Sequence, residues 1–166
     1  MNDLLILANL LDGPKHGYAL KKQVGLIFGR EEMHNNLVYP LLRRFVLNRW
    51  VSKREVSGQR GQTREVYALT SKGKSELLRR LVTFTEKEAA SQNEFFLRAG
   101  LFVLLDKAAR GRILAERDRW LAAREAKLGR LVSAMDVGQW GGEVVGFLRQ
   151  QTRAERRWIS RLRRNV

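Results

Sequence analysis

The chain has 166 residues and carries 32 lysine and arginine residues against 17 aspartate and glutamate residues, a formal net charge of +15. Hydrophobic residues make up 44% of the chain and charged residues 30%, a balance that allows a packed core and argues against general disorder. The chain contains no cysteine, which excludes disulfides, thiolate catalysis and cysteine-ligated zinc.

The positive charge is spread over the whole chain. Residues 1–82 hold 15 basic and 7 acidic side chains, a net of +8, and residues 83–166 hold 17 and 10, a net of +7. Such a surface attracts polyanions, so nucleic acid is the first partner to consider and an anionic membrane surface the second. The longest apolar run, residues 95–105, is too short to cross a bilayer and contains Arg98. Because residues 1–11 also make a poor signal peptide, we expect a cytoplasmic protein.

Three helices are expected at the N-terminal end. Apolar residues fill positions 4–8, 10 and 11, and Asp12-Gly13-Pro14 ends this first helix. Apolar residues then recur at helical spacing from Tyr18 to Phe28, which predicts a second helix with a basic edge and with Tyr18 in the core. A polar turn over residues 29–34 precedes a third helix. This helix should begin near Asn36, because Pro40 is tolerated best in an opening turn.

Two strands are expected after the helices, over residues 50–56 and 64–70. The segment between them, residues 57–63, is polar, basic and rich in glycine, as is typical of a hairpin tip. Three helices followed by a basic hairpin are typical of a winged helix-turn-helix. In that fold the third helix enters a major groove while the wing touches neighbouring phosphates.

The C-terminal half is predicted to be helical. Asp106 can cap a long helix over residues 107–135, and a second apolar stripe follows a turn over residues 136–142. Two such helices would leave apolar surface uncovered, so we expect packing against a second subunit. The expected dimer contacts are Leu114, Leu121, Leu128, Leu131, Met135, Leu148, Trp158, Ile159 and Leu162.

The predicted fold is therefore mainly α-helical with a small β-hairpin. It comprises an N-terminal winged helix-turn-helix over residues 1–82 and a C-terminal helical dimerisation arm over residues 83–166.

Three segments carry a family resemblance: residues 13–18 (Gly-Pro-Lys-His-Gly-Tyr), 38–44 (Val-Tyr-Pro-Leu-Leu-Arg-Arg) and 64–73 (Arg-Glu-Val-Tyr-Ala-Leu-Thr-Ser-Lys-Gly). In this order and spacing they resemble the PadR family of transcriptional regulators. The resemblance implies a homodimeric, repressor-like protein that binds a palindromic operator in double-stranded DNA through helix three and the wing. It also implies a possible small aromatic or hydrophobic effector. Residues 34–37 depart from the small or hydroxyl residues usual in the family, which bears on operator preference.

The candidate DNA contacts form three groups. Helix three offers Asn35, Asn36, Tyr39, Arg43 and Arg44, where asparagine suits adenine edges, arginine suits guanine edges, and tyrosine suits phosphate. The wing offers Lys53, Arg54, Arg60 and Arg64 for backbone phosphates, with Arg60 at the tip. Helix two adds Lys15, His16, Lys21 and Lys22 as secondary candidates. The alternative is that Asn36 only caps a helix, Tyr39 packs between helices, and the arginines are solvated.

Two features of the C-terminal half have competing interpretations. Its last helix carries seven arginines, from Arg149 to Arg164, opposed only by Glu155, and a solvated face is favoured over a second DNA site. Trp120, Trp140 and Trp158 are candidates for the border of an effector pocket, although dimer core is the more common role for such tryptophans.

No catalytic or metal site is predicted. Gly73-Lys74-Ser75 ends like a phosphate-binding loop, but Ala68 stands where that motif needs its first glycine. His16 and His34 lack neighbouring ligands, so no metal or cofactor is expected, and no nucleophile has a matching base. The alternatives to a regulator are a protein-binding adaptor built on the winged helix, and a non-specific nucleic-acid-binding or membrane-surface protein.

Overall fold

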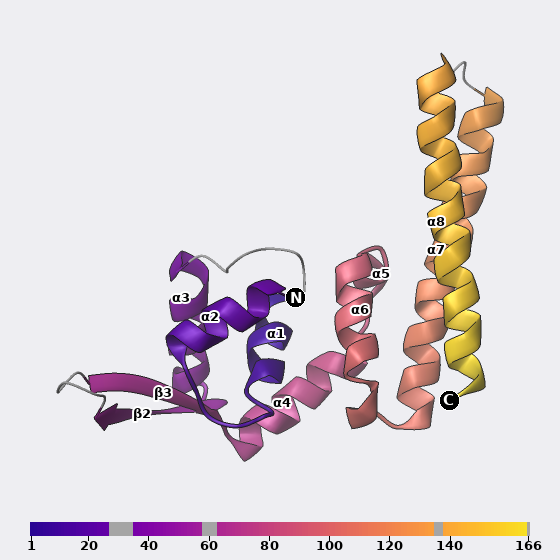
Figure 1. The fold of residues 1–166 in the computed structure, drawn as a ribbon. Coiled ribbons are helices and arrows are strands. Elements are labelled where there is room, and N and C mark those ends of the chain that lie inside the picture. Colours follow the sequence, from indigo (N-terminus) through magenta and orange to yellow (C-terminus); the bar gives the residue numbers. More distant parts are fainter. Residues whose placement is uncertain (27–34, 58–62, 135–137, 166) are drawn as a thin grey trace. The chain divides into compact units, whose positions relative to one another are not determined.

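A computed structural model of the chain describes residues 1–26, 35–57, 63–134 and 138–165, apart from the side chains of residues 21, 23–26, 35, 36 and 132–134. The chain forms two compact units, Met1–Thr83 and Phe84–Val166. In Figure 1 the first unit is indigo to pink and the second runs from pink to yellow. We call them the winged unit and the helical unit.

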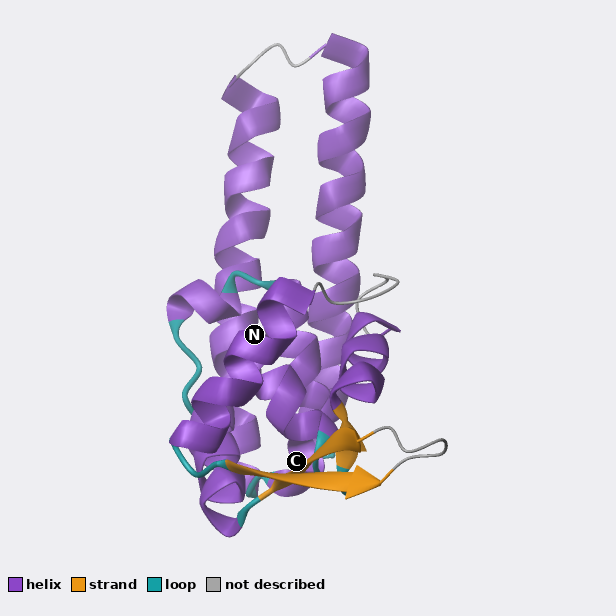
Figure 2. Cartoon of the chain, turned by 90° about the vertical axis from the view of Figure 1, so that its left-hand side faces the viewer, coloured by secondary structure: helices purple, strands orange, loops and turns teal. Residues whose placement is uncertain are grey.

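The winged unit combines helices α1 to α4 with a small sheet that lies at one side of them (Figures 1 and 2). Its elements are α1 (Asn2–Asn9), β1 (Lys15–His16), α2 (Gly17–Leu26), α3 (Asn35–Leu47), β2 (Val51–Ser57), β3 (Thr63–Leu69) and α4 (Ser71–Val82). The strands form an antiparallel sheet in the order β1-β3-β2. The core contains apolar side chains that are almost completely buried, among them Ile6, Leu7, Leu20, Val38, Leu42, Phe45, Leu77 and Leu81. The predicted winged helix-turn-helix with a β-hairpin is confirmed.

Strand β1 replaces the predicted first turn of helix two. Lys15 pairs with Tyr67 and His16 with Val66, so these two residues extend the hairpin into a third strand. Gly13 has φ +122°, a conformation that favours glycine, and this redirects the chain before β1. Because the following backbone amides pair with β3, helix α2 begins only at Gly17. Its next residue, Tyr18, is 64% exposed, so the expectation that Tyr18 belongs to the core was wrong.

Helix α3 continues through its proline. The helix begins at Asn35, which places Pro40 in the second turn and not in the opening turn as predicted. Val38 before the proline and Leu42 and Phe45 after it are all fully buried. This continuous apolar face stabilises the helix on both sides of Pro40 and offsets the missing amide hydrogen bond.

Helix α4, which the sequence analysis did not predict, is joined tightly to the start of β2. The Thr70 hydroxyl accepts a hydrogen bond from the Gly73 amide at 2.9 Å and donates to the carbonyl oxygens of Arg49 and Trp50 at 2.7 and 3.0 Å. A Cβ atom on Gly73 would lie 1.9 Å from the Trp50 carbonyl oxygen. The Thr70-x-x-Gly73 segment is therefore a close backbone junction, and the resemblance of Gly73 to a phosphate-loop glycine has no functional meaning.

The helical unit is built on two long antiparallel helices, α7 (Lys107–Ala134) and α8 (Gly138–Arg164) (Figures 1 and 2). The short helices α5 (Glu86–Ala89) and α6 (Gln92–Gly100) and the 3-10 turn η2 (Phe102–Leu104) precede them. Asp106 Oδ1 accepts a hydrogen bond from the Ala109 amide at 2.6 Å, which confirms the predicted cap of α7. Helix α8 begins at Gly138, so the predicted turn over residues 136–142 is largely helical.

The predicted apolar seam of α7 is already covered within one chain. Leu114, Leu121 and Leu128 are 0%, 1% and 9% exposed, and Ile159 of α8 is 0% exposed. The uncovered seam offered as the reason for a dimer therefore does not exist at these four positions, because α7 and α8 pack along their lengths. Leu131 is 36% exposed, Leu148, Trp158 and Leu162 are half-buried, and Met135 lies outside the described residues.

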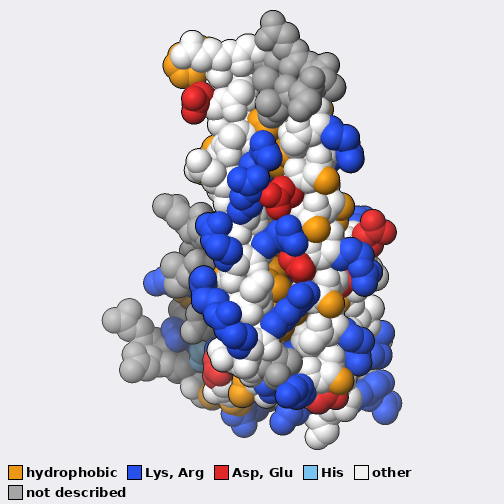
Figure 3. All heavy atoms as spheres, turned by 90° about the vertical axis from the view of Figure 1, so that its right-hand side faces the viewer, with side chains coloured by type: hydrophobic (Ala, Val, Ile, Leu, Met, Phe, Trp, Pro, Cys, Tyr) orange, Lys and Arg blue, Asp and Glu red, His pale blue; other side chains and the backbone are white. Residues whose placement is uncertain are grey.

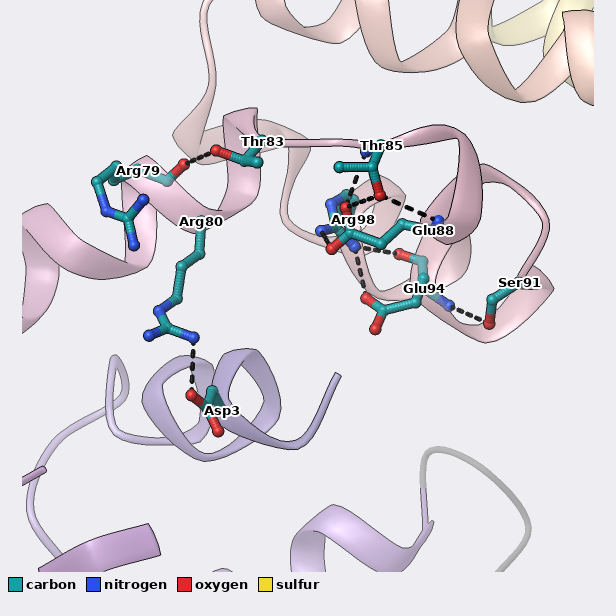
Figure 4. Close-up of polar contacts among 9 residues, drawn as sticks. All are labelled: Asp3, Arg79, Arg80, Thr83, Thr85, Glu88, Ser91, Glu94 and Arg98. Atoms are coloured by element: carbon teal, nitrogen blue, oxygen red, sulfur yellow. Dashed lines mark hydrogen bonds and ion pairs between the residues drawn. The ribbon is translucent and has the colours of Figure 1, made fainter. Parts of the chain in front are cut away.

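Two buried arginines organise the helical unit. Arg117 is 1% exposed, makes a two-point ion pair with Glu155 (2.7 and 2.9 Å), and donates to the Ala89 carbonyl oxygen. Arg98 is also 1% exposed and pairs with Glu88 and Glu94, each at 2.6 Å (Figure 4). These contacts tie together α5, α6, α7 and α8.

The arginines of α8 are only partly a solvated face. Arg153 and Arg156 pair with Glu125 of α7, and Arg156 and Arg163 pair with Asp118. Figure 3 shows acidic side chains lying between basic ones along this helical pair. Glu155 is the only acidic residue between Arg149 and Arg164, but the facing helix α7 supplies two further opposing carboxylates, Asp118 and Glu125. Arg157, Arg161 and Arg164 are exposed.

Candidate nucleic-acid interface

A concave surface of the winged unit lies where α3, the start of α2 and the sheet meet. A cavity of about 610 Å³ is lined by His16, Gly17, Tyr18, Ala19, Tyr39, Arg64, Glu65 and Tyr67. A second cavity of about 400 Å³ is lined by Tyr39, Arg43, Val46, Leu47, Lys53, Glu65 and Tyr67. Because Tyr39, Glu65 and Tyr67 line both cavities, these residues form the centre of one continuous surface, which we call the α3–sheet face.

Tyr39 both packs and remains accessible. Its ring lies against Gly17, where a Cβ atom would come within 3.0 Å of Tyr39 Cε1. Gly17 therefore makes room for the ring, and the side chain is still 37% exposed. The two interpretations of Tyr39, packing between helices and exposure to a ligand, are thus compatible.

The neighbouring arginines of α3 point in different directions. Arg44 Nη2 lies 2.5 Å from Asp3 Oδ2 on α1, and Arg80 binds the same carboxylate at 2.7 Å (Figure 4 shows the Arg80 contact). Arg43 instead lines the α3–sheet face beside Lys53 and Glu65. Successive residues of a helix are rotated by about 100°, so only Arg43 of this pair lies on the α3–sheet face.

The wing carries its cations on two opposite faces. Strands β2 and β3 pair Lys53 with Tyr67 and Glu55 with Glu65, while Arg54 pairs with Val66 and Arg64 with Val56. Since side chains alternate along a strand, Lys53 shares a face with two carboxylates, and Arg54 and Arg64 share the other. Their binding to backbone phosphates stays a prediction, with Lys53 on one side of the strand alternation and Arg54 and Arg64 on the other. Arg60, the predicted tip residue, lies outside the described residues.

Glu65 is the central charged residue that the sequence analysis missed. Its carboxylate forms an ion pair with Lys53 Nζ and accepts a hydrogen bond from the Tyr67 hydroxyl at 2.6 Å. The Lys53 contact, followed by that of Tyr67, lowers the pKa of Glu65, and burial raises the pKa of Tyr67. The alternation of β3 could have placed Glu65 and Tyr67 on one face, but only the strand register identifies Lys53 as their partner.

The secondary candidates for DNA contact, which were assigned to helix two, have different surroundings in the structure. Lys15 pairs with Asp12 at 3.5 Å, and His16 Nδ1 forms a hydrogen bond with the Glu65 carbonyl oxygen at 3.3 Å. Lys22 is exposed on α2. The side chains of Lys21, Asn35 and Asn36 lie outside the described part of the structure, although their backbone belongs to α2 and α3.

The three tryptophans do not border one pocket of a single chain. Trp140 and Trp158 are 18 residues apart on the straight helix α8, which corresponds to about 27 Å at 1.5 Å per residue. Trp140 is 79% exposed, whereas Trp158 packs edge-on against Phe95 and Phe96 with ring centroids 5.7 and 5.6 Å away. Trp120 lies under the guanidinium groups of Arg117 and Arg124.

A search of the described residues found no group of three or more histidine, cysteine, aspartate or glutamate side chains that could hold a metal ion. Within the same residues, none of the helices has the length and apolar character needed to span a bilayer.

Solved structures similar to this chain include several regulators. A transcriptional regulator of Thermoplasma acidophilum is 30% identical over 46% of this chain and 72% of its own, with a TM-score of 0.43. A PadR family regulator of Clostridium difficile is 28% identical over 48% and 81%, with a TM-score of 0.42. Bacillus subtilis PadR, solved in complex with operator DNA, is 19% identical over 96% and 95%, with a TM-score of 0.49. A search of curated proteins found no match.

The comparison with protein families is specific to the winged unit. The model of the family described as "Transcriptional regulator PadR-like family" matches residues 6–79, which run from α1 into α4. This range contains all three segments on which the resemblance was based. The chain belongs to the PadR-like family of transcriptional regulators.

Proposed function

We propose that this PadR-like regulator is a sequence-specific DNA-binding protein that acts as a homodimeric repressor on a palindromic operator. The observation that carries this proposal is the α3–sheet face, where Tyr39 and Arg43 of α3 are exposed beside a basic hairpin. PadR family regulators bind DNA and are not enzymes. A helix presented next to a wing suits the major groove and the adjacent phosphates.

The candidate DNA contacts of α3 and the wing have different roles in this proposal. Arg43 reads a guanine edge in the major groove, and Tyr39 contacts a neighbouring phosphate. Arg54 and Arg64, which share one face of the hairpin, bind backbone phosphates. No ion pair joins Arg43, Arg54 or Arg64 to another described residue, which leaves their guanidinium groups available. Asn35 and Asn36 at the start of α3 remain proposed readers of adenine.

The two arginines of α3 provide the test of DNA binding. Fluorescence anisotropy is measured with a labelled duplex from the upstream region of the protein's own gene and with a scrambled duplex of equal composition. Arg43→Ala should weaken binding to the upstream duplex by about 1–3 kcal/mol, the usual value of a base-reading arginine. Arg44→Ala is the matched control, because Asp3 already holds Arg44, and it should change affinity much less.

Two outcomes would refute this function. Equal affinity of the unsubstituted protein for both duplexes would instead favour non-specific nucleic-acid binding, and no binding to either would favour a protein-binding adaptor. Thermal melting of both variants must accompany the measurement, since Arg44→Ala removes an ion pair that joins α3 to α1.

The proposed dimer is supported by a different apolar surface from the one expected. Trp140, Val144 and Phe147 are 79%, 58% and 59% exposed, and their spacing of four and three residues aligns them on one side of α8. A contiguous exposed apolar stripe of this kind favours association with another copy. We therefore place the dimer contact on this stripe and not on Leu114, Leu121, Leu128 or Ile159.

Light scattering coupled to size exclusion tests the dimer. Phe147→Glu puts a charge into the apolar stripe and should shift the protein from dimer to monomer. Ser160→Glu adds the same charge at an exposed position on the opposite side of α8 and should leave the dimer intact. A monomeric unsubstituted protein, or a dimer unaffected by Phe147→Glu, would contradict the assignment.

Release by a small aromatic or hydrophobic effector remains part of the proposal. If Trp140 lies in the dimer contact, an effector site that includes this residue forms only between two copies. The intrinsic fluorescence of Trp140→Phe, compared with the unsubstituted protein during titration with planar aromatic compounds, tests this arrangement.

A further inference from the structure

A carboxylate at the centre of a DNA-facing surface is unfavourable for phosphate binding, and Glu65 occupies that position. Glu65 lines both cavities of the α3–sheet face and retains 43% side-chain exposure. Directly across the hairpin lies a second carboxylate, Glu55. On the side of the strand alternation that holds Glu65, the two hairpin strands therefore carry two negative charges and one positive charge, that of Lys53, while Arg64 also contributes to the lining of the larger cavity.

The contacts of Glu65 hold its carboxylate in a fixed position. The Tyr67 hydroxyl donates to Oε2 at 2.6 Å, and Tyr67 itself is only 4% exposed, so this donor is anchored in the core. The other oxygen, Oε1, binds Lys53 Nζ. Lys53 is 40% exposed, yet its ammonium group is engaged before any DNA arrives. A cation that is already paired within the protein adds less to the release of counterions from DNA.

We propose that Glu65 is a specificity-determining residue that suppresses non-specific DNA binding by keeping Lys53 engaged within the protein. This inference rests on the proposed DNA-binding function. Non-specific complexes sample many registers and use any available cation, because they depend on phosphate contacts alone. The operator complex has one register, fixed by base contacts such as that of Arg43. Occupying Lys53 therefore weakens the non-specific complexes more than the specific one.

The Arg54 and Arg64 face of the wing supports this division of roles. By strand alternation Arg54 and Arg64 lie on the side opposite Glu65, although Arg64 also contributes to the lining of the larger cavity, and no ion pair joins either guanidinium group to another described residue. The hairpin thus presents one face with available cations and one face on which the cation is held by an acid. Only the second face lines the smaller cavity beside Arg43.

The test uses Glu65→Gln in the full-length protein. Affinity for the upstream duplex and for a scrambled duplex is measured over a series of salt concentrations. Freeing one lysine should steepen the salt dependence on scrambled DNA by about one unit. If one lysine–phosphate contact contributes nothing to the binding free energy at 1 M salt, this slope corresponds to about a fivefold gain in affinity at 0.15 M salt. The gain on the upstream duplex should be smaller, so the specificity ratio should fall.

Two further variants separate the ion pair from a general effect of charge. Glu55→Gln removes the same charge from the opposite position on the same face, and no ion pair joins Glu55 to another described residue. It should change the affinity for scrambled DNA by clearly less than Glu65→Gln. In the background of Lys53→Gln, Glu65→Gln should lose most of its effect on the salt slope.

The inference is overturned if Glu65→Gln and Glu55→Gln act equally, or if the effect of Glu65→Gln persists undiminished without Lys53. Either result leaves the proposed function intact, provided that the unsubstituted protein still prefers the upstream duplex. Loss of that preference in the unsubstituted protein would defeat the proposed function itself. Circular dichroism melting confirms that each variant is folded.

Discussion

The winged unit and the helical unit carry almost the same net charge but differ in whether their charged side chains are buried. In the helical unit, Arg98 and Arg117 are each 1% exposed and are paired with carboxylates inside the packing of four helices. Among the described residues of the winged unit, no charged side chain is buried. With a similar number of charged residues, the helical unit therefore buries some of its charged side chains, whereas the winged unit keeps those of its described residues at the surface.

Net charge alone therefore does not locate a nucleic-acid surface. A guanidinium group that is buried and paired contributes nothing to polyanion binding, however strongly it raises the net charge. Arg153, Arg156 and Arg163 join α8 to α7 in the same manner at the surface of the helical unit. In the winged unit, Arg43, Arg54 and Arg64 have no such partners among the described residues.

The largest effect is expected where the helical unit depends on its buried ion pair. Arg117→Ala leaves Glu155, whose side chain is only 8% exposed, without its partner, and it should destabilise this unit by about 3–5 kcal/mol. The measurement is urea unfolding followed by hydrogen exchange resolved along the chain, which distinguishes the two units.

The matched control for Arg117 lies two residues away on the same helix. Arg119 pairs with Glu116, but its side chain is 74% exposed, so Arg119→Ala should cost about 0.5 kcal/mol or less. Equal losses of unfolding free energy from Arg117→Ala and Arg119→Ala would show that burial of arginine is not what distinguishes the units.

A second, smaller effect should reveal what the winged unit depends on instead. Gly73→Ala forces a methyl group against the Trp50 carbonyl oxygen at the junction of β2 and α4, and it should destabilise the winged unit by about 1–3 kcal/mol. Thermal unfolding followed by the fluorescence of Trp50 measures this loss, in a background where the other three tryptophans are replaced by phenylalanine.

Gly111 provides the control in the helical unit. It belongs to α7, and no atom would lie within 4 Å of an added Cβ atom. Gly111→Ala should therefore stabilise its helix by about 0.5–1 kcal/mol. If Gly73→Ala left the stability of the winged unit unchanged, the backbone junction there would have to relax easily.

The smallest expected effect is a loss of unfolding free energy at low pH. Hydrogen bonding to Arg79, and then to Arg80, lowers the pKa of Glu76 from 4.5 to about 2. A folded-state pKa below the unfolded one gives stability that is complete above pH 4.5 and is lost as the pH falls toward 2. Solvent screens this pair, because the Arg79 side chain is 63% exposed, so the loss should be about 1 kcal/mol or less.

Glu76→Gln should flatten the pH dependence of unfolding of the winged unit within that window. The helical unit should keep its own acid sensitivity, because contacts with Arg153 and Arg156 lower the pKa of Glu125. Urea midpoints measured in buffers from pH 5 to about pH 2.5, in steps of about half a unit, test both statements. An unchanged slope in Glu76→Gln would show that other carboxylates control acid unfolding of this unit.

The winged helix-turn-helix and the family could both be predicted from the sequence. Period-3.6 stripes, the hairpin loop and three ordered motifs are local signals, and each needs only neighbouring residues to be recognised. The Asp106 cap of α7 was predictable for the same reason, since the capping carboxylate and the Ala109 amide that donates to it lie three residues apart.

The partners of the charged and apolar side chains, in contrast, could be identified only from the folded chain. Four features depend on contacts between residues that are distant in the sequence. They are the pairing of strand β1 with β3, the ion pair that turns Arg44 away from Arg43, the Lys53–Glu65 pair and the Arg117–Glu155 pair. The heptad leucines of α7 were recognised from their spacing, but spacing could not show that α8 of the same chain covers them. Periodicity defines which face of an element is apolar, whereas the partner of that face is set by packing across the fold.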